Sequence, residues 1–348
     1  MTRLFLDDPN AVHLVRTVAA GGENNPPLYH LLLRAWASVA GTSTFALRLP
    51  SALFVAAAFV LLWRALRREF PWPAVAIALG LTFFPADAVL DQVAQARFYG
   101  LFLFSGAAAV ATALEVARRE QPGPWLLSAT GASHLLLLYS HTFGILYSAA
   151  IVAALGVLDA RARRLRAAPY LAIAAAWLAF VPWIPWVLEQ GKMARPTAWI
   201  APPTFRRLSG VMQRLTSPLS LVVAGVGLVA LLRRRFGPVA VSIPRNPIAP
   251  TVVIGGSVAA VAPLVWLESR LAIPIFVDRY VLPSALGWPL IVAPVIAAVL
   301  MRMRDRVATI AGAAAFALLA SSAVLAAGRR ERTQAPDTLV APAARFAP

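Results

Sequence analysis

The sequence predicts an all-α membrane protein: a polytopic helical bundle of about ten spans with juxtamembrane helices on its extracytoplasmic face. Of the 348 residues, 59% are hydrophobic and only 14% are charged, whereas soluble domains carry about 25% charged residues. Apolar stretches of about 17 to 25 residues, the length needed to cross the hydrocarbon core of a bilayer, recur along the chain. These two observations exclude a soluble globular protein.

The predicted spans alternate with short polar loops. Several contain proline, which membrane helices tolerate when neighbouring groups take up the freed backbone hydrogen bonds. The ten spans cover residues 45–66, 73–90, 96–117, 123–138, 142–158, 169–188, 217–232, 250–267, 281–301 and 307–327.

Arginine clusters in every second loop set the orientation, because positively charged loops stay on the cytoplasmic side. The clusters lie at 64–68, 118–119, 161–166, 233–235 and 302–306. The net charge of +17, from 32 basic and 15 acidic residues, is therefore a signal of topology and anion binding. A nucleic-acid binder would instead gather its cations on one polar surface. The chain has no cysteine, which excludes thiol and disulfide chemistry.

Two segments outside the spans have the spacing of amphipathic helices that lie in the membrane interface. Residues 26–41 repeat apolar side chains at helical spacing, with His30, Arg34 and Ser38 opposite them. Residues 205–215 are the second candidate. We therefore divide the chain into an extracytoplasmic loop with an interfacial helix (1–44), a transmembrane domain (45–327) and a short extracytoplasmic tail (328–348).

Polar residues collect on the extracytoplasmic side, where carboxylates mix with Arg, His and Tyr. Ionisable groups at the membrane mark functional sites. A carboxylate can remove a proton from a hydroxyl, and Arg with Tyr can hold a phosphate and its developing charge. Taken alone, this inventory is a weak signal of catalysis.

Four short sequence motifs strengthen this signal of catalysis. They are NPPLYHLLL from Asn25 followed by ALRLPSALF from Ala46, then QARFYG from Gln95, LYSHTFG from Leu138 and DRYVLP from Asp278. In order and topology these resemble the membrane glycosyltransferases of the GT-C class, of the glycosyltransferase family 39 and aminoarabinose-transferase type. The family patterns are "PPLYYLLL … ALRLPSALFG", "EARxYAL", "LYTHYxG" and "RYLLP".

The resemblance implies a GT-C-like fold and a transferase of the bacterial inner membrane. It implies transfer of a sugar from a polyprenyl-phosphate donor to a lipid, glycan or protein acceptor at the outer face, with no nucleic-acid partner. An acidic residue in the first extracytoplasmic loop then acts as base, for which Asp7 and Asp8 are candidates. Asp91 is a third, because Gln95 stands where the family has Glu and Asp91 lies one helical turn earlier. The expected donor and phosphate contacts are Asn25, Tyr29, Arg97, Tyr99, His141, Arg279 and Tyr280.

The chain also departs from the family pattern, since no span precedes residue 44 and the pair Asp7-Asp8 lies closer to Pro26 than the family's acidic pair does. Either a shorter loop supplies the base, or the true start lies upstream; span parity favours the second. Some relatives use a divalent ion, and Glu23, His30 and His141 are the residues that could hold one, although no ligand spacing is present. The rival interpretations are a transporter or lipid flippase, and a non-catalytic family member.

Each candidate also has a plainer structural interpretation. Asp7 and Asp8 fit a solvated turn or a helix N-cap, Arg97 and Tyr99 fit an interfacial anchor, and His141 fits a hydrogen-bonded turn residue. Arg279-Tyr280 opens a span, and Asn25 and Tyr29 flank a stiff proline pair.

Overall fold

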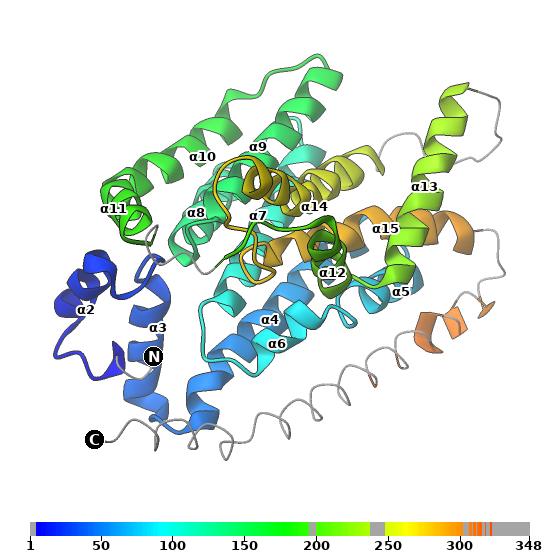
Figure 1. Ribbon diagram of the computed structural model, residues 1–348. Helices are drawn as coiled ribbons and strands as arrows, with labels where there is room; N and C mark the ends of the chain where they lie inside the picture. The colour runs from blue at the N-terminus through cyan, green and yellow to red at the C-terminus, as the bar shows by residue number, and fades with distance from the viewer. Residues whose placement is uncertain are drawn as a thin grey trace.

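The computed structural model describes residues 5–194, 200–236 and 248–301, together with isolated residues between 306 and 321. Within these ranges all regular secondary structure is helical, which confirms the predicted all-α bundle (Figure 1). The helices are α2 (Ala11–Thr17), η1 (Val18–Gly22), α3 (Leu28–Ala40), α4 (Thr44–Arg67), α5 (Trp72–Thr82), α6 (Asp87–Val93), α7 (Tyr99–Arg118), α8 (Pro124–Ser140), α9 (Gly144–Arg161), α10 (Ala167–Phe180), η2 (Val181–Trp183), α11 (Ile184–Ala194), α12 (Phe205–Leu215), α13 (Pro218–Phe236), α14 (Ile248–Leu271), η4 (Leu282–Leu286) and α15 (Gly287–Leu300).

Six segments of the described chain are long and apolar enough to cross a membrane, and each coincides with a predicted span. α8, predicted as a span, is an apolar helix of 17 residues, and α13 contributes the shorter apolar helix Pro218–Gly227. The predicted span 307–327 lies mostly outside the described residues, so the count of ten stays a prediction. The six segments are Thr44–Arg67, Tyr99–Arg118, Gly144–Arg161, Ala167–Lys192, Pro250–Leu271 and Leu282–Leu300.

Residues 73–90, predicted as one span, form two helices in the structure, which together are apolar enough to be a single broken span or a re-entrant loop. α5 and α6 meet at a bend of 86°, and the break contains Phe83, Phe84 and Pro85. Proline lacks a backbone N–H and disfavours the helical conformation of the residue before it, so the helix ends here. By contrast, Pro50 lies inside the 24-residue helix α4 without ending it.

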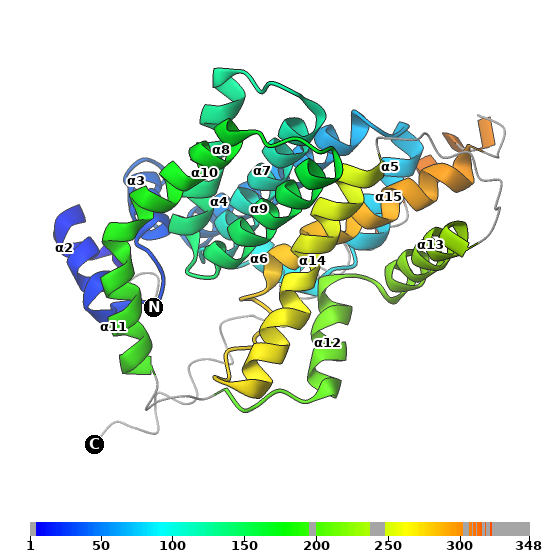
Figure 2. The same cartoon turned by 90° about the horizontal axis from the view of Figure 1, so that it is seen from above.

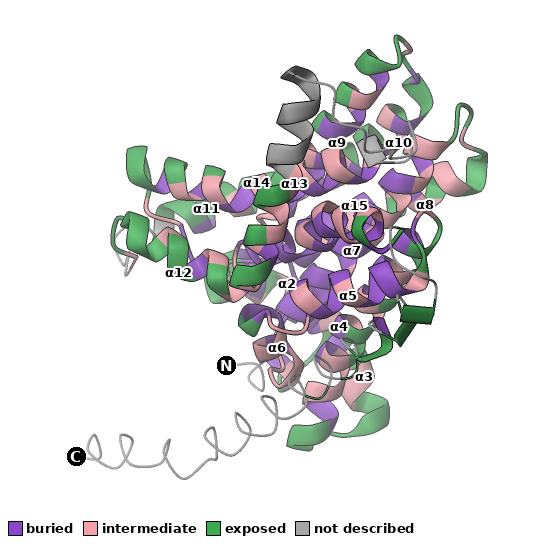
Figure 3. Ribbon diagram, turned by 90° about the vertical axis from the view of Figure 1, so that its right-hand side faces the viewer, coloured by how far each residue is buried: buried purple, intermediate pink, exposed green. Residues whose placement is uncertain are grey.

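Helix α7 is the centre of the bundle and packs against α4, α8, α9 and η4 (Figures 1 and 2). Its glycines allow these close approaches: a Cβ on Gly100 would lie 2.8 Å from the carbonyl oxygen of Ser51 in α4. A Cβ on Gly106 would lie 3.0 Å from Leu286. Buried residues are concentrated along α7 and its neighbours, and exposed ones on outer helices such as α11 and α12 (Figure 3). Helix α7 has 20 residues and is therefore about 30 Å long. We use its two ends to name the two ends of the bundle.

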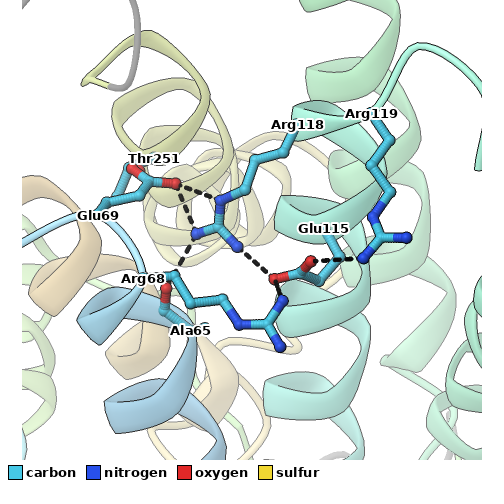
Figure 4. Close-up of polar contacts among 7 residues, drawn as sticks. All are labelled: Ala65, Arg68, Glu69, Glu115, Arg118, Arg119 and Thr251. Carbon is cyan, nitrogen blue, oxygen red and sulfur yellow. Dashed lines mark hydrogen bonds and ion pairs between the residues drawn. The ribbon is translucent and has the colours of Figure 1, made fainter.

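One end of the bundle is rich in arginine and is held by an ionic network (Figure 4). Arg118 at the end of α7 donates to Glu69 at 2.6 Å and to the carbonyl oxygen of Ala65 at 2.9 Å. The hydroxyl of Thr251 in α14 donates to the other oxygen of Glu69 at 2.5 Å. Arg118 also pairs with Glu115. The network therefore joins the ends of α4, α7 and α14. We call this end of the bundle the arginine-rich end.

The N-terminal helices form a separate layer beside the opposite end of the bundle (Figure 1). The two predicted helices over residues 26–41 and 205–215 are present as α3 and α12, and their place in the membrane interface stays a prediction. Val18 and Leu14 pack with Phe180 and Trp183 in a small core of their own, and Gln190 in α11 donates to the carbonyl oxygen of Val18 at 2.8 Å.

Candidate functional site

The four sequence motifs meet at the end of α7 away from the arginine-rich end. Asn25 before α3 accepts a hydrogen bond from the backbone N–H of Thr142 at 3.3 Å, which ties the first motif to the third. The ring of Tyr280, in the fourth motif, lies 5.4 Å from the ring of Phe143. Tyr99, in the second motif, lies 5.8 Å from His141. Segments spread over most of the chain thus form one cluster.

Tyr29 and Arg97 are joined through Ser51. The Tyr29 hydroxyl lies 3.4 Å from the Ser51 hydroxyl, and the Ser51 hydroxyl donates to the carbonyl oxygen of Arg97 at 3.0 Å. This bridge requires the close approach of α4 and α7 at Gly100. Burial raises the pKa of Tyr29 to about 12, although Ser51 and Arg97 oppose the shift. Tyr29 is therefore a neutral hydroxyl that can donate a hydrogen bond.

The guanidinium of Arg97 is half-buried and makes no ion pair or hydrogen bond with the described residues. Its charge acts on Tyr29, His30 and Tyr99. Because a buried or half-buried cation is normally paired, Arg97 is suited to bind an anionic ligand.

His141 lies in the tight turn between α8 and α9, which Gly144 allows because a Cβ there would lie 2.2 Å from the carbonyl oxygen of Leu137. Nδ1 of His141 accepts from the N–H of Phe143 at 3.0 Å, so the proton of the neutral ring is on Nε2. Nε2 is buried and has no hydrogen-bond partner among the described residues. Burial, aided by Arg279, lowers the pKa of His141 to about 3. His141 thus offers a neutral N–H donor inside the aromatic cluster.

Arg279 and Tyr280 lie at the edge of the same cluster. The guanidinium carbon of Arg279 lies 5.5 Å from the centre of the Tyr280 ring, and its charge acts on Tyr99 and His141. Next to them Asp278 pairs with Arg214 of α12, which also binds Asp91 of α6 at 2.5 Å. Arg214 therefore clamps α6 and α12 to the start of the fourth motif, and Asp91 is engaged in this clamp.

His30 is the residue that the sequence pattern placed wrongly, since we expected it on the exposed side of the interfacial helix. It is 4% exposed because the ring of Phe5 covers it at 4.3 Å and Tyr29 contacts its edge. Neither ring nitrogen has a hydrogen-bond partner among the described residues. Burial, with the charge of Arg97, lowers the pKa of His30 to about 4.

The acidic candidates lie in different surroundings. Asp7 is exposed, whereas the Asp8 carboxylate pairs with Nδ1 of His13, a partner that sequence analysis missed. Glu23, immediately before the first motif, acts electrostatically on Tyr99 in the cluster. It forms no ion pair with the described residues and accepts from the N–H of Asn24 at 2.9 Å.

The residues considered for a divalent ion do not form a site for it. In the described parts of the chain, no three His, Cys, Asp or Glu side chains come close enough together to hold a metal ion. Glu23, His30 and His141 therefore do not fit a metal ion in this arrangement.

Comparison with known proteins agrees with the motifs. Residues 24–186 match the family described as dolichyl-phosphate-mannose-protein mannosyltransferase. ArnT from Cupriavidus metallidurans, solved in the apo state, is similar in structure with a TM-score of 0.41 and 14% identity, covering 85% of this chain and 72% of that one. No curated protein sequence matches the chain.

The family match covers the first three motifs and confirms the resemblance to the GT-C membrane glycosyltransferases over that stretch. The six apolar helices support a multi-pass membrane protein.

Proposed function

We propose that the protein transfers a sugar from a polyprenyl-phosphate donor to a hydroxyl acceptor at the extracytoplasmic face of the bacterial inner membrane. The observation that carries this proposal is the convergence of the four motifs around an unpaired guanidinium and an unpaired imidazole N–H, on Arg97 and His141. The matched family is itself described by a lipid-linked sugar, dolichyl-phosphate-mannose.

The arrangement suits a phosphate with an apolar tail. Arg97, Arg279 and the Nε2–H of His141 supply donors for the phosphate oxygens, and Tyr29 and Tyr280 supply phenolic hydroxyls. Asn25 fixes the turn that holds His141. The apolar surfaces of the surrounding helices accommodate the polyprenyl chain.

The reaction is a direct displacement at the anomeric carbon. The acceptor oxygen forms the new bond to this carbon while the bond to the phosphate oxygen breaks, and its electron pair leaves on the phosphate. Arg97, Arg279 and His141 stabilise the charge that develops there, as donors aimed at a leaving group do in other transferases. The proton of the acceptor hydroxyl passes to a carboxylate.

Four carboxylates are candidates for this base. Asp7, Asp8 and Asp91 follow from the sequence, and Glu23 joins them because its charge acts on Tyr99. Asp8 is already paired with His13, and Asp91 with Arg214. Glu23 is the carboxylate that the surroundings favour.

The bend between α5 and α6 is the observation that favours a transporter or flippase, because discontinuous helices line the substrate sites of many transporters. The break contains the apolar residues Phe83 and Pro85, but the carboxylate Asp87 begins α6 directly after it. The glycosyltransferase proposal is preferred because the matched family is described as a mannosyltransferase.

The test is transfer of radiolabelled sugar from a panel of polyprenyl-phosphate sugars by membranes that contain the full chain. We expect label in a product that is separable from the donor. Donor movement across vesicles without any product would overturn the proposal in favour of a flippase, and absence of both would favour a non-catalytic protein.

The same assay identifies the base. Glu23→Gln, Asp7→Asn, Asp8→Asn and Asp91→Asn are compared at equal amounts of folded protein. We expect Glu23→Gln to cause the greatest loss of kcat with little change of KM, as removal of a general base costs about 10²- to 10⁴-fold. A greater loss of kcat in one of the Asp variants would assign the base to that residue instead.

A further inference from the structure

At the arginine-rich end, the turn between α9 and α10 contains a cavity of about 600 Å³. Its walls are mainly apolar and include Val152, Gly156 and Leu165. Arg163 and Arg164 also line it. Ligand sites in proteins have volumes of about 300 to 1,000 Å³, so this cavity is large enough for a small group or part of a lipid.

The acidic residue that lines the cavity is already neutralised. One oxygen of Asp159 accepts from Arg166 at 2.5 and 2.9 Å, and the other accepts from the hydroxyl of Tyr170 at 3.0 Å. Arg166 also donates to the carbonyl oxygen of Val116 at 2.5 Å, which ties the turn to the end of α7. Asp159 is thus engaged mainly by Arg166 and Tyr170, and only weakly by the more distant Arg164.

Of the two arginines that line the cavity, Arg163 is the one without a partner among the described residues. Its side chain is exposed and makes no ion pair or hydrogen bond with any described residue. Its backbone has φ of 48°, a left-handed conformation that is uncommon for a residue other than glycine. The charge of Arg164 is only partly neutralised, because its Nε lies as far as 3.5 Å from the Asp159 carboxylate. The cavity therefore carries excess positive charge at its mouth.

Exposed leucines lie in the turn and on the helix that follows it. Leu165, between the two cationic turn residues and Arg166, is 86% exposed, and Leu171 on α10 is 67% exposed. An apolar side chain exposed beside arginines is typical of a segment that lies at the boundary between lipid headgroups and acyl chains.

We propose that this cavity binds one anionic phospholipid. Its phosphate lies against Arg163 and Arg164, and one acyl chain lies along Val152, Gly156 and Leu165. Basic pockets between membrane helices on the cytoplasmic side recognise anionic headgroups in this way. A free anion would gain nothing from the apolar wall. A zwitterionic lipid would bring a phosphate together with a positively charged ammonium group, which the two arginines repel. The proposal does not depend on the glycosyltransferase reaction.

The test uses the purified full-length chain in detergent, mixed with equal amounts of dioleoyl-phosphatidylglycerol and dioleoyl-phosphatidylcholine. Native mass spectrometry measures which lipid stays bound. We expect retention of phosphatidylglycerol, and about fivefold weaker binding in Arg163→Gln, as expected for one arginine at an anionic headgroup. Leu165→Ser is expected to weaken binding as well, because it removes part of the apolar wall.

Arg207→Gln is the matched control. It removes the same charge from an exposed arginine on α12, and we expect it to leave lipid retention unchanged. Equal retention of the two lipids, or equal loss in Arg163→Gln and Arg207→Gln, would overturn the proposal. Displacement of phosphatidylglycerol by an excess of inorganic phosphate would also overturn it, since the cavity would then recognise the free anion.

Discussion

The ring of Tyr280 lies 5.6 Å from the ring of His141, although one residue precedes α9 and the other follows α14. The contact is supported one turn away, where the hydroxyls of Tyr147 and Ser284 lie 2.9 Å apart. The fourth motif is therefore held against the third by both an aromatic and a polar contact. This pairing fixes the edge of the site at which Arg279 lies.

Arg97→Ala should strongly reduce transfer while leaving the protein folded. The guanidinium has no ionic partner among the described residues, so its removal leaves no unpaired charge behind. We expect kcat to fall by about 10²- to 10³-fold, as when one donor to a developing negative charge is lost. The measurement is sugar transfer at equal amounts of protein that elutes as a single species in size-exclusion chromatography.

Arg206→Ala is the control for this change, because Arg206 is an exposed arginine on α12. It should retain full turnover. Arg97→Lys should restore part of the activity, since lysine keeps the charge but not the planar pair of donors. Unchanged turnover in Arg97→Ala would contradict the assignment of this site.

Two of the three buried histidines in the described chain, His30 and His141, belong to the site and should make stability depend on pH. The pKa is about 4 for His30 and about 3 for His141 in the folded protein, against about 6.5 in an unfolded chain. As the pH falls, these histidines are therefore protonated in the unfolded chain before they are protonated in the folded protein. Stability is full above about pH 6.5 and decreases as the pH falls towards 4, by up to about 1.4 kcal/mol per pH unit for each histidine.

The measurement is the apparent Tm in detergent between pH 7.5 and pH 4.5. His30→Phe and His141→Phe should each reduce the slope, and the double variant should reduce it most. A slope that stays the same in the double variant would show that other groups cause the acid sensitivity.

Gly100→Ala should separate α7 from α4. The added Cβ would lie 2.8 Å from the carbonyl oxygen of Ser51, which must move and thereby disturb the bridge from Tyr29 to Arg97. We expect a loss of about 1 to 3 kcal/mol of stability, typical of overpacking, and lower transfer activity.

Gly256→Ala is the matched control, since a Cβ there meets nothing within 4 Å. It should be neutral or stabilise α14 by up to about 1 kcal/mol. Thermal unfolding in detergent compares the two variants, and equal Tm values would mean that the α4 and α7 contact is softer than the structure indicates.

The sequence predicted the long apolar helices and the members of the aromatic and cationic cluster, because helix length and motif order are local properties. It did not predict the bend at Pro85, since other prolines such as Pro50 are accommodated inside helices. Nor did it predict the burial of His30, which depends on Phe5 folding back over α3. Contacts between distant segments decide such features, and hydrophobic periodicity carries no information about them.

Arg118→Met should destabilise the arginine-rich end. The Glu69 side chain is only 5% exposed, and without Arg118 it would be a buried charge held by Thr251 alone. Loss of one partner from a buried pair costs about 3 to 5 kcal/mol, and partial exposure of Arg118 places the expected loss at the lower end of this range.

Arg119→Met is the control: this residue is 55% exposed and lies 3.8 Å from Glu115, so its loss should cost less than about 1 kcal/mol. The double variant Arg118→Met with Glu69→Gln should recover much of the lost Tm, because the buried charge is removed with its partner. Equal effects of Arg118→Met and Arg119→Met would show that the network in Figure 4 does not hold α4, α7 and α14 together.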